Sequence, residues 1–239
     1  MQRRPLGVLA LGLILAAVAT AAAQEAATNA IPVIHPVGSE PQPPPSPVRW
    51  DGDLATLGSV QLDAATKTVS ATGWVNQTEG PIEVLACGNA GKVHESVFVL
   101  TLNPLDLQAA LLLAGLKAGE PMPNIGQGPP QGDPVDIFVE WQAGDGIRKA
   151  RAESFVWNVE GNAVLPETPW IFTGSVVKDG QFKAFAEESL VVTYWDPYAI
   201  VNLPLPCGGN DEILAVNSNT VPPYQTPVTF RFVPRPGTP

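Results

Sequence analysis

Most of the sequence beyond residue 68 is divided into short runs rich in Val, Ile, Thr and aromatic residues, and Gly, Pro, Asn or Asp interrupts them. Runs of this length and composition are typical of β-strands, and the interrupting residues favour turns. Gly-containing turns at 144–146 and 179–180 predict hairpins. The expected strands are residues 68–75, 82–86, 93–102, 134–141, 147–157, 169–177, 181–186, 189–195 and 227–233.

One segment departs from the strand pattern. Residues 103–115 read NPLDLQAALLLAG, in which Asn103 suits a helix cap, Pro104 the first helical position and Gly115 the end. The segment is apolar nearly all round, so we expect it to be buried on most sides. The sequence therefore predicts a β-rich α+β fold, an antiparallel sheet or sandwich-like domain with one prominent buried helix at about 104–114.

The N-terminal residues predict export. Residues 1–23 combine two arginines, an apolar run and small residues ending at Ala23, which is the pattern of a cleaved signal peptide; an uncleaved anchor is the alternative. Pro-rich residues 24–48 predict a disordered linker. We expect residues 49–236 to form a single domain, and no transmembrane helix in the mature chain.

The charge of the chain argues against nucleic acid as a partner. The formal net charge is -10, and removal of residues 1–23, which hold two arginines and no acids, leaves eleven basic and twenty-three acidic residues. A chain this acidic is repelled by phosphate backbones. An envelope protein or a small ligand is the expected partner.

The stretch ACGNAGKVHESVFVL, residues 86–100, gathers reactive side chains at a predicted turn. If residues 88–91 form the loop of an antiparallel hairpin, Cys87 lies opposite Lys92 and Glu83 opposite Ser96, on one polar face. The simplest interpretation is a solvent-exposed polar face of a strand beside a turn, without a chemical role. The candidate catalytic residues are His94, Cys87, Lys92, Glu95 and Ser96.

A metal site or a disulfide is an alternative use of the same region. Zinc or another metal ion would take ligands from Cys87, His94, Cys207 and Glu83, although we expect no cofactor. The two cysteines could instead form a disulfide in an exported protein, or stay free. The sequence leaves these alternatives open, and it contains no complete phosphate-loop, zinc-protease or serine-hydrolase motif.

Several segments together resemble the YdjY-type domain of exported bacterial proteins, from about residue 70 to 233. This family has no settled activity, so the resemblance implies an exported domain and names no substrate. The matching segments are IEVLACGNAGKVHESV, LQAALLLAGL, DIFVEW, AESFVWN, PWIFTGS, YWDPYAI and TPVTFRF.

Few catalytic groups are available for chemistry, because His94 is the one histidine of the expected domain and the cysteines number two. The leading hypothesis is therefore an exported binding or assembly module of the cell envelope, with an unidentified ligand. The rival hypothesis is a metal- or thiol-dependent enzyme, or a redox protein, that uses Cys87 and His94.

Overall fold

The computed structural model describes residues 42–235 of the chain. The predicted signal peptide, the larger part of the predicted linker and the last predicted domain residue lie outside these described residues. Residues 42–48 belong to the predicted linker, and they are held against the domain. The Gln42 side chain exchanges two hydrogen bonds with the backbone of Phe182, at 2.8 and 2.6 Å.

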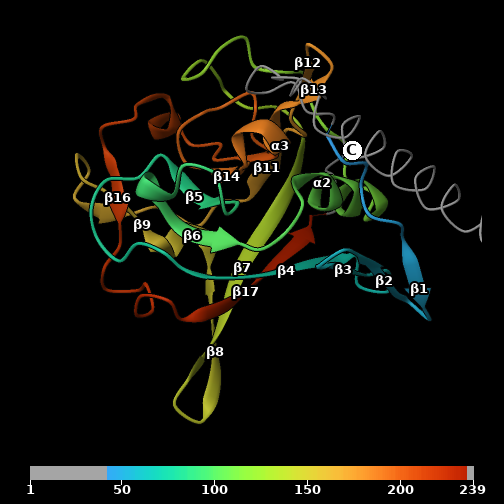
Figure 1. Ribbon diagram of the computed structural model, residues 1–239. Helices are drawn as coiled ribbons and strands as arrows, with labels where there is room; N and C mark the ends of the chain where they lie inside the picture. Colours follow the sequence, from blue (N-terminus) through green and yellow to red (C-terminus); the bar gives the residue numbers. More distant parts are fainter. Residues whose placement is uncertain (1–41, 236–239) are drawn as a thin grey trace, which may run out of the picture. The chain divides into compact units, whose positions relative to one another are not determined.

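Eight strands form a sheet that closes on itself into a barrel (Figure 1). The last of them, β6, pairs back with the first, β4, so the ring has no break. The predicted sandwich-like arrangement is therefore wrong, whereas the β-rich character is confirmed. In order around the ring, the strands are β4 (Thr68–Val75), β17 (Pro227–Pro234), β7 (Asp133–Ala143), β11 (Trp170–Phe172), β15 (Val201–Asn202), β14 (Ser189–Val192), β5 (Val84–Cys87) and β6 (Ser96–Leu100).

The ring closes because one edge of β4 serves two neighbours. Its first residues pair with β3 (Val60–Asp63), and its last residues, Gly73 to Val75, pair with β6. A Cβ atom on Gly73 would lie 2.0 Å from the carbonyl oxygen of Val99. Glycine in a strand marks such a close approach of two backbones. Sequence alternation identifies β4 as a strand and carries no information about this shared edge.

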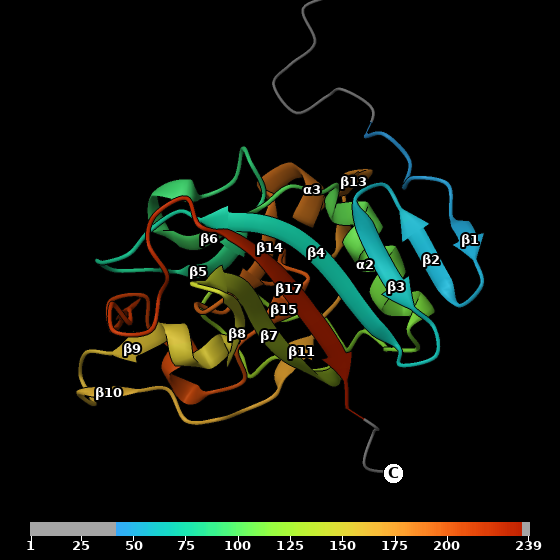
Figure 2. The same ribbon diagram turned by 90° about the horizontal axis from the view of Figure 1, so that it is seen from below.

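The remaining strands extend or accompany the barrel. Next to β3 lie β2 (Leu54–Leu57) and β1 (Arg49–Asp51), which form an arm beside helix α2 (Figure 2). The hairpin of β7 with β8 (Gly146–Arg151) turns at 144–146 as predicted and projects from the rest of the domain in Figure 1. The other strands are β9 (Val156–Asn158), β10 (Ala163–Val164) and β16 (Leu214–Val216) in one small sheet, and β12 (Val177–Lys178) with β13 (Gln181–Phe182) in another.

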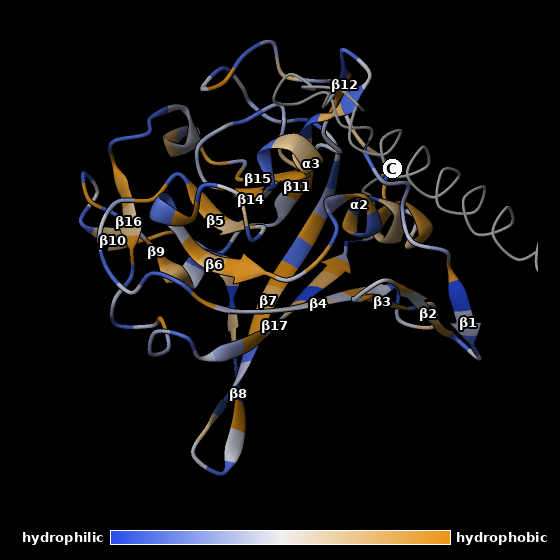
Figure 3. Ribbon diagram, viewed as in Figure 1, coloured by the Kyte–Doolittle hydropathy of each residue, from blue (hydrophilic) through white to orange (hydrophobic). Residues whose placement is uncertain are grey.

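Aromatic side chains occupy the centre of the core. The ring of Phe98 meets Phe155 and Phe230 edge to face, with centroids 5.1 and 5.2 Å apart. Strand β6 is buried along its whole length, and beyond its first residue, Ser96, it is apolar, as its orange colour in Figure 3 shows. Strand β7 instead alternates between buried and partly exposed residues, since one face looks into the core and the other outward.

The described residues contain two α-helices. The predicted helix is confirmed as α2 (Pro104–Leu113), whose cap Asn103 accepts a hydrogen bond from the Leu105 N–H at 3.0 Å. In its first turn the buried Asp106 carboxylate accepts hydrogen bonds from the backbone and hydroxyl of Ser46, at 2.6 and 2.8 Å. Helix α3 (Lys183–Glu187) occupies part of the strand predicted at 181–186, so that prediction is wrong there.

Replacing Gly73 with alanine is expected to lower the free energy of unfolding by about 3 kcal/mol, because the added methyl group meets backbone atoms that cannot move aside. The matched control is Gly146→Ala, since a Cβ at that position meets nothing within 4 Å. Urea unfolding of both variants measures the difference. Equal stability of the two variants would contradict the closure of the ring at Gly73.

Candidate functional site

Two short connections cross the same face of the barrel. Strands β5 and β6 are parallel neighbours joined by residues 88–95, and β14 and β15 are parallel neighbours joined by residues 193–200. Parallel strands usually need a connection of a dozen or more residues. Because β5 and β14 pair with each other, both connections run back over this strand pair. We call residues 88–95 and 193–200 the two crossovers.

The first crossover replaces the antiparallel hairpin that the sequence predicts. Val84 pairs with Ser96, and Ala86 with Phe98, in parallel register. Residues Val93–Glu95 form a short 3-10 helix that returns the chain to the start of β6. The predicted pairing of Cys87 with Lys92 and of Glu83 with Ser96 is therefore wrong, and the single polar face built on it does not exist.

Cys87 is fully buried beneath the crossovers. It packs in a small apolar cluster with Val84, Val99, Val192 and Ala199. Burial raises the pKa of its thiol to about 11, and the hydrogen bond with Ser96 offsets only part of this effect. A buried thiol of high pKa is inert as a nucleophile.

His94 lies apart from Cys87, on the surface. Its side chain is 77% exposed, and its Nε2 atom is 3.8 Å from Glu95 Oε2. Ser96 is buried, and its hydroxyl donates a hydrogen bond of 2.7 Å to the carbonyl of Lys92. The structure therefore does not join these side chains into a nucleophile–base pair.

Lys92 joins two acids that are distant in the predicted hairpin. Its Nζ atom is 2.6 Å from Glu83 Oε2 and 3.0 Å from Glu95 Oε1. The pKa of Lys92 is raised: burial lowers it, and the hydrogen bonds to Glu83 and Glu95 outweigh that effect. This triad of Glu83, Lys92 and Glu95 is the part of the predicted site that the structure brings together.

Cys207 lies in the third 3-10 helix of the described residues, Pro206–Gly209, and both cysteines are free thiols. Within residues 42–235 no three His, Cys, Asp or Glu side chains are grouped closely enough to hold a metal ion. The four suggested metal ligands, Cys87, His94, Cys207 and Glu83, are therefore not gathered at one point.

A cavity of about 200 Å³ opens between the two crossovers. Val84 and Val192 are its buried apolar residues, Lys92 belongs to the first crossover, and Glu187 comes from the end of α3. The full lining is Glu83, Val84, Lys92, Ile125, Glu187, Ser189, Val192, Tyr194, Asp196 and Tyr198. We call this the acidic cavity.

Asp196 is the most enclosed charged group of the acidic cavity, with only 9% of its surface exposed. Its Oδ1 atom accepts the Tyr198 N–H at 2.8 Å, and its backbone is held by the buried side chain of Asn202, at 2.9 and 3.0 Å. Burial raises the pKa of Asp196; the Tyr198 N–H and the charge of Lys92 oppose this, and the charge of Glu187 adds to it. The carboxylate is thus rigidly placed and costly to ionise.

Asp196, Tyr194 and Tyr198 were not predicted as site residues from the sequence. They lie in YWDPYAI, which carried the family resemblance, just as Glu83 and Lys92 lie in IEVLACGNAGKVHESV. The convergence of these two segments on one cavity is visible only in three dimensions. The signal available in the sequence was the carboxylate of Asp196 itself, because it stands just after the predicted strand 189–195 in a segment without a strand or helix pattern.

A second cavity, of about 490 Å³, adjoins the first, because Ile125 and Tyr198 line both. Its other lining residues come from the irregular Pro/Gly loop at 121–134 and from 176–178 and 197. That loop is held in place, since the Gly126 N–H donates a hydrogen bond of 2.7 Å to the carbonyl of Trp195. The remaining lining is Met122, Pro123, Asn124, Val176, Lys178 and Pro197.

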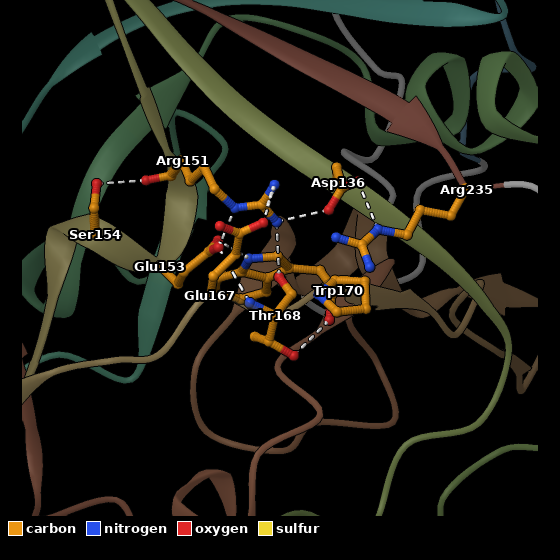
Figure 4. Close-up of polar contacts among 9 residues, drawn as sticks. Asp136, Arg151, Glu153, Ser154, Glu167, Thr168, Trp170 and Arg235 are labelled. Atoms are coloured by element: carbon orange, nitrogen blue, oxygen red, sulfur yellow. Dashed lines mark hydrogen bonds and ion pairs between the residues drawn. The ribbon is translucent and has the colours of Figure 1, made fainter.

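A separate charged cluster, shown in Figure 4, is fully partnered. Arg151 contacts Asp136 at 2.6 Å and also pairs with Glu153, which is 2% exposed. Glu153 also accepts hydrogen bonds from the Thr168 backbone and the Trp170 ring, at 3.2 and 3.3 Å. Because its buried charges satisfy one another, the cluster is structural, and it leaves the acidic cavity as the candidate site.

The two thiols are expected to differ sharply in reactivity. In the native protein, Cys207 should react slowly with a disulfide reagent and Cys87 only after unfolding, because Cys87 is fully buried. Thiol titration of the Cys207→Ala variant, native and in denaturant, measures this directly. A native Cys207→Ala protein that still reacts readily would show that Cys87 is accessible.

Asp196→Asn is expected to stabilise the domain at neutral pH by about 1 kcal/mol, because the amide keeps the acceptor for Tyr198 and removes a buried charge. The folded pKa is raised, so the wild-type carboxyl loses stability as the pH rises above about 4 through the folded pKa. Thermal unfolding across pH should show the two proteins converging in acid. A variant less stable than wild type at neutral pH would contradict the assigned environment.

Within residues 42–235, no helix has the length and apolarity that a membrane crossing requires.

Comparison with curated proteins gives no significant match, and comparison with solved structures gives none either. A model of the YdjY domain does match, over residues 60–232, which is most of the chain and includes both crossovers. The predicted resemblance is confirmed, and the chain belongs to the YdjY domain family.

Proposed function

We propose that this chain is an exported binding module of the bacterial cell envelope, which holds a small ligand in the acidic cavity. The observation that carries the proposal is the Asp196 carboxylate, nine-tenths buried and lining a cavity of about 200 Å³. A buried carboxylate destabilises the folded chain unless an interaction with a ligand or a partner offsets the loss of its hydration.

The construction of the site favours binding. Asn202 fixes the backbone of Asp196 from two sides, and the Tyr198 N–H fixes its carboxylate. The backbone of each crossover is also held at its start: the Gly88 N–H donates to the Glu188 carbonyl at 2.9 Å, and the Thr193 and Tyr194 N–H groups donate to the Glu83 carbonyl at 2.9 and 3.0 Å. Preformed concave sites with a few placed polar groups on apolar walls are typical of small-molecule binding.

The rival proposal, a thiol- or metal-dependent enzyme, draws less support from the geometry. It depends on Cys87 and His94, of which one is fully buried and the other largely exposed. Export rests on the signal-peptide pattern of residues 1–23.

The test is to express the full precursor in a bacterium and recover the protein natively from the envelope fraction. Intact mass should show a chain that begins after Ala23. Small molecules released on denaturation are then identified by mass spectrometry. We expect one compound enriched with wild type and lost in Ile125→Trp, whose added ring obstructs the cavity mouth.

The matched control is Ile147→Trp, at another exposed isoleucine, on the β7–β8 hairpin, that lines neither cavity. This variant should retain the compound. Protein retained in the cytoplasm, or recovery of the same molecules from wild type and Ile125→Trp, would overturn the proposal.

A further inference from the structure

We infer that the ligand of the acidic cavity is an organic cation, a primary amine or guanidinium carried on an apolar body. The inference rests on the proposed function and names the chemical class of its ligand. It is drawn from the charges that line the acidic cavity, from the two tyrosine rings and from the apolar walls of the adjoining cavity.

The charges of the acidic cavity do not cancel. Lys92 is its one basic lining residue, and it is already paired with Glu83 and Glu95, so it offers no free positive charge to an anion. Glu187 forms no ion pair within residues 42–235, and Asp196 has none either. A phosphate or carboxylate would be repelled here, whereas a cation placed between Glu187 and Asp196 would gain from both.

Asp196 also has acceptor capacity to spare. A carboxylate accepts about four hydrogen bonds. Within the described residues the Asp196 carboxylate accepts the Tyr198 N–H at 2.8 Å, and the side chain of Ser189 also hydrogen-bonds to it, so acceptor positions remain for a ligand. An ammonium or guanidinium group supplies the missing donors together with the opposite charge, and charge-assisted hydrogen bonds of this type are about twice as strong as neutral ones.

The tyrosines suit the same ligand. Tyr194 and Tyr198 both line the acidic cavity, and aromatic ring faces attract cations. The ring of Tyr198 already has the Nζ atom of Lys183 5.9 Å from its centroid. This contact shows that the Tyr198 ring already interacts with one positive charge of the domain, whereas no such contact is found for the Tyr194 ring within the described residues.

The apolar part of the ligand has its own place. Beyond Ile125 and Tyr198, the adjoining cavity is lined by the apolar residues Met122, Pro123, Val176 and Pro197 and by the polar residues Asn124 and Lys178, so it offers an apolar surface for the body of the ligand and no acidic group for its charge. A cationic head beside Asp196 would therefore extend an apolar body toward the loop at 121–134. A bare metal ion would leave these walls unused, and it would find no set of three grouped ligands within residues 42–235.

Calorimetry with three matched probes, phenethylamine, phenethyl alcohol and phenylacetate, tests the ligand class. Slightly alkaline pH is chosen because it favours the ionised form of Asp196 while the amine stays protonated. Phenethylamine should bind about tenfold tighter than the alcohol, and phenylacetate weakest. Glu187→Gln and Asp196→Asn should each weaken the amine about tenfold and leave the alcohol unchanged. Because Asp196→Asn is expected to be more stable than wild type, lost binding would not reflect unfolding.

The control Glu160→Gln removes the same charge from an exposed turn outside both cavities and should not change amine binding. Equal or tighter binding of the alcohol or of phenylacetate, if blocked by Ile125→Trp, would overturn the ligand class and leave the binding module standing. Tight binding of calcium chloride alone, abolished by Asp196→Asn, would also overturn it. Absence of binding by any probe, together with no co-purified compound, would overturn both proposals.

Discussion

The fold depends on one edge of β4, which pairs first with β3 and then with β6. The second pairing brings two backbones so close at Gly73 that no side chain fits between them. Strand β6 pairs with β4 on one side and lies parallel to β5 on the other. Because β6 is parallel to β5, the chain that leaves β5 has to return along the barrel before β6 begins, and this return is the first crossover.

The second crossover repeats this geometry next to the first. Strand β14 is also followed along the chain by a strand that pairs with it in parallel, β15. Because β14 pairs with β5, the connection at residues 193–200 lies beside residues 88–95 on the same face. Cys87, Val192 and their neighbours fill the space beneath as a separate apolar cluster. The acidic cavity is what remains between the two segments, and its polar groups come from loops positioned by a rigid scaffold.

Local pattern predicts what is local in this chain. Helix α2 with its Asn103 cap, strands β4 and β17 and the turn at 144–146 follow from periodicity and capping. The parallel pairing of β5 with β6 could not be predicted, because alternation is the same in both directions and the connection is unusually short. Lys92 and Glu83 were named from the sequence for a pairing that does not form, whereas Asp196 was missed because its neighbours are distant along the chain.

Two groups of buried charge thus have different roles. The charges of the Asp136–Arg151–Glu153 cluster pair with one another, while the Asp196 carboxylate lines the acidic cavity and can accept further hydrogen bonds.

The most direct measurement is a crystal structure of the mature protein with phenethylamine. The amine nitrogen is predicted to lie within hydrogen-bond distance of the Asp196 and Glu187 carboxylates, with the ring toward Ile125 and Pro197. An acidic cavity without the amine, or an amine bound elsewhere on the domain, would contradict the assignment of a cation site.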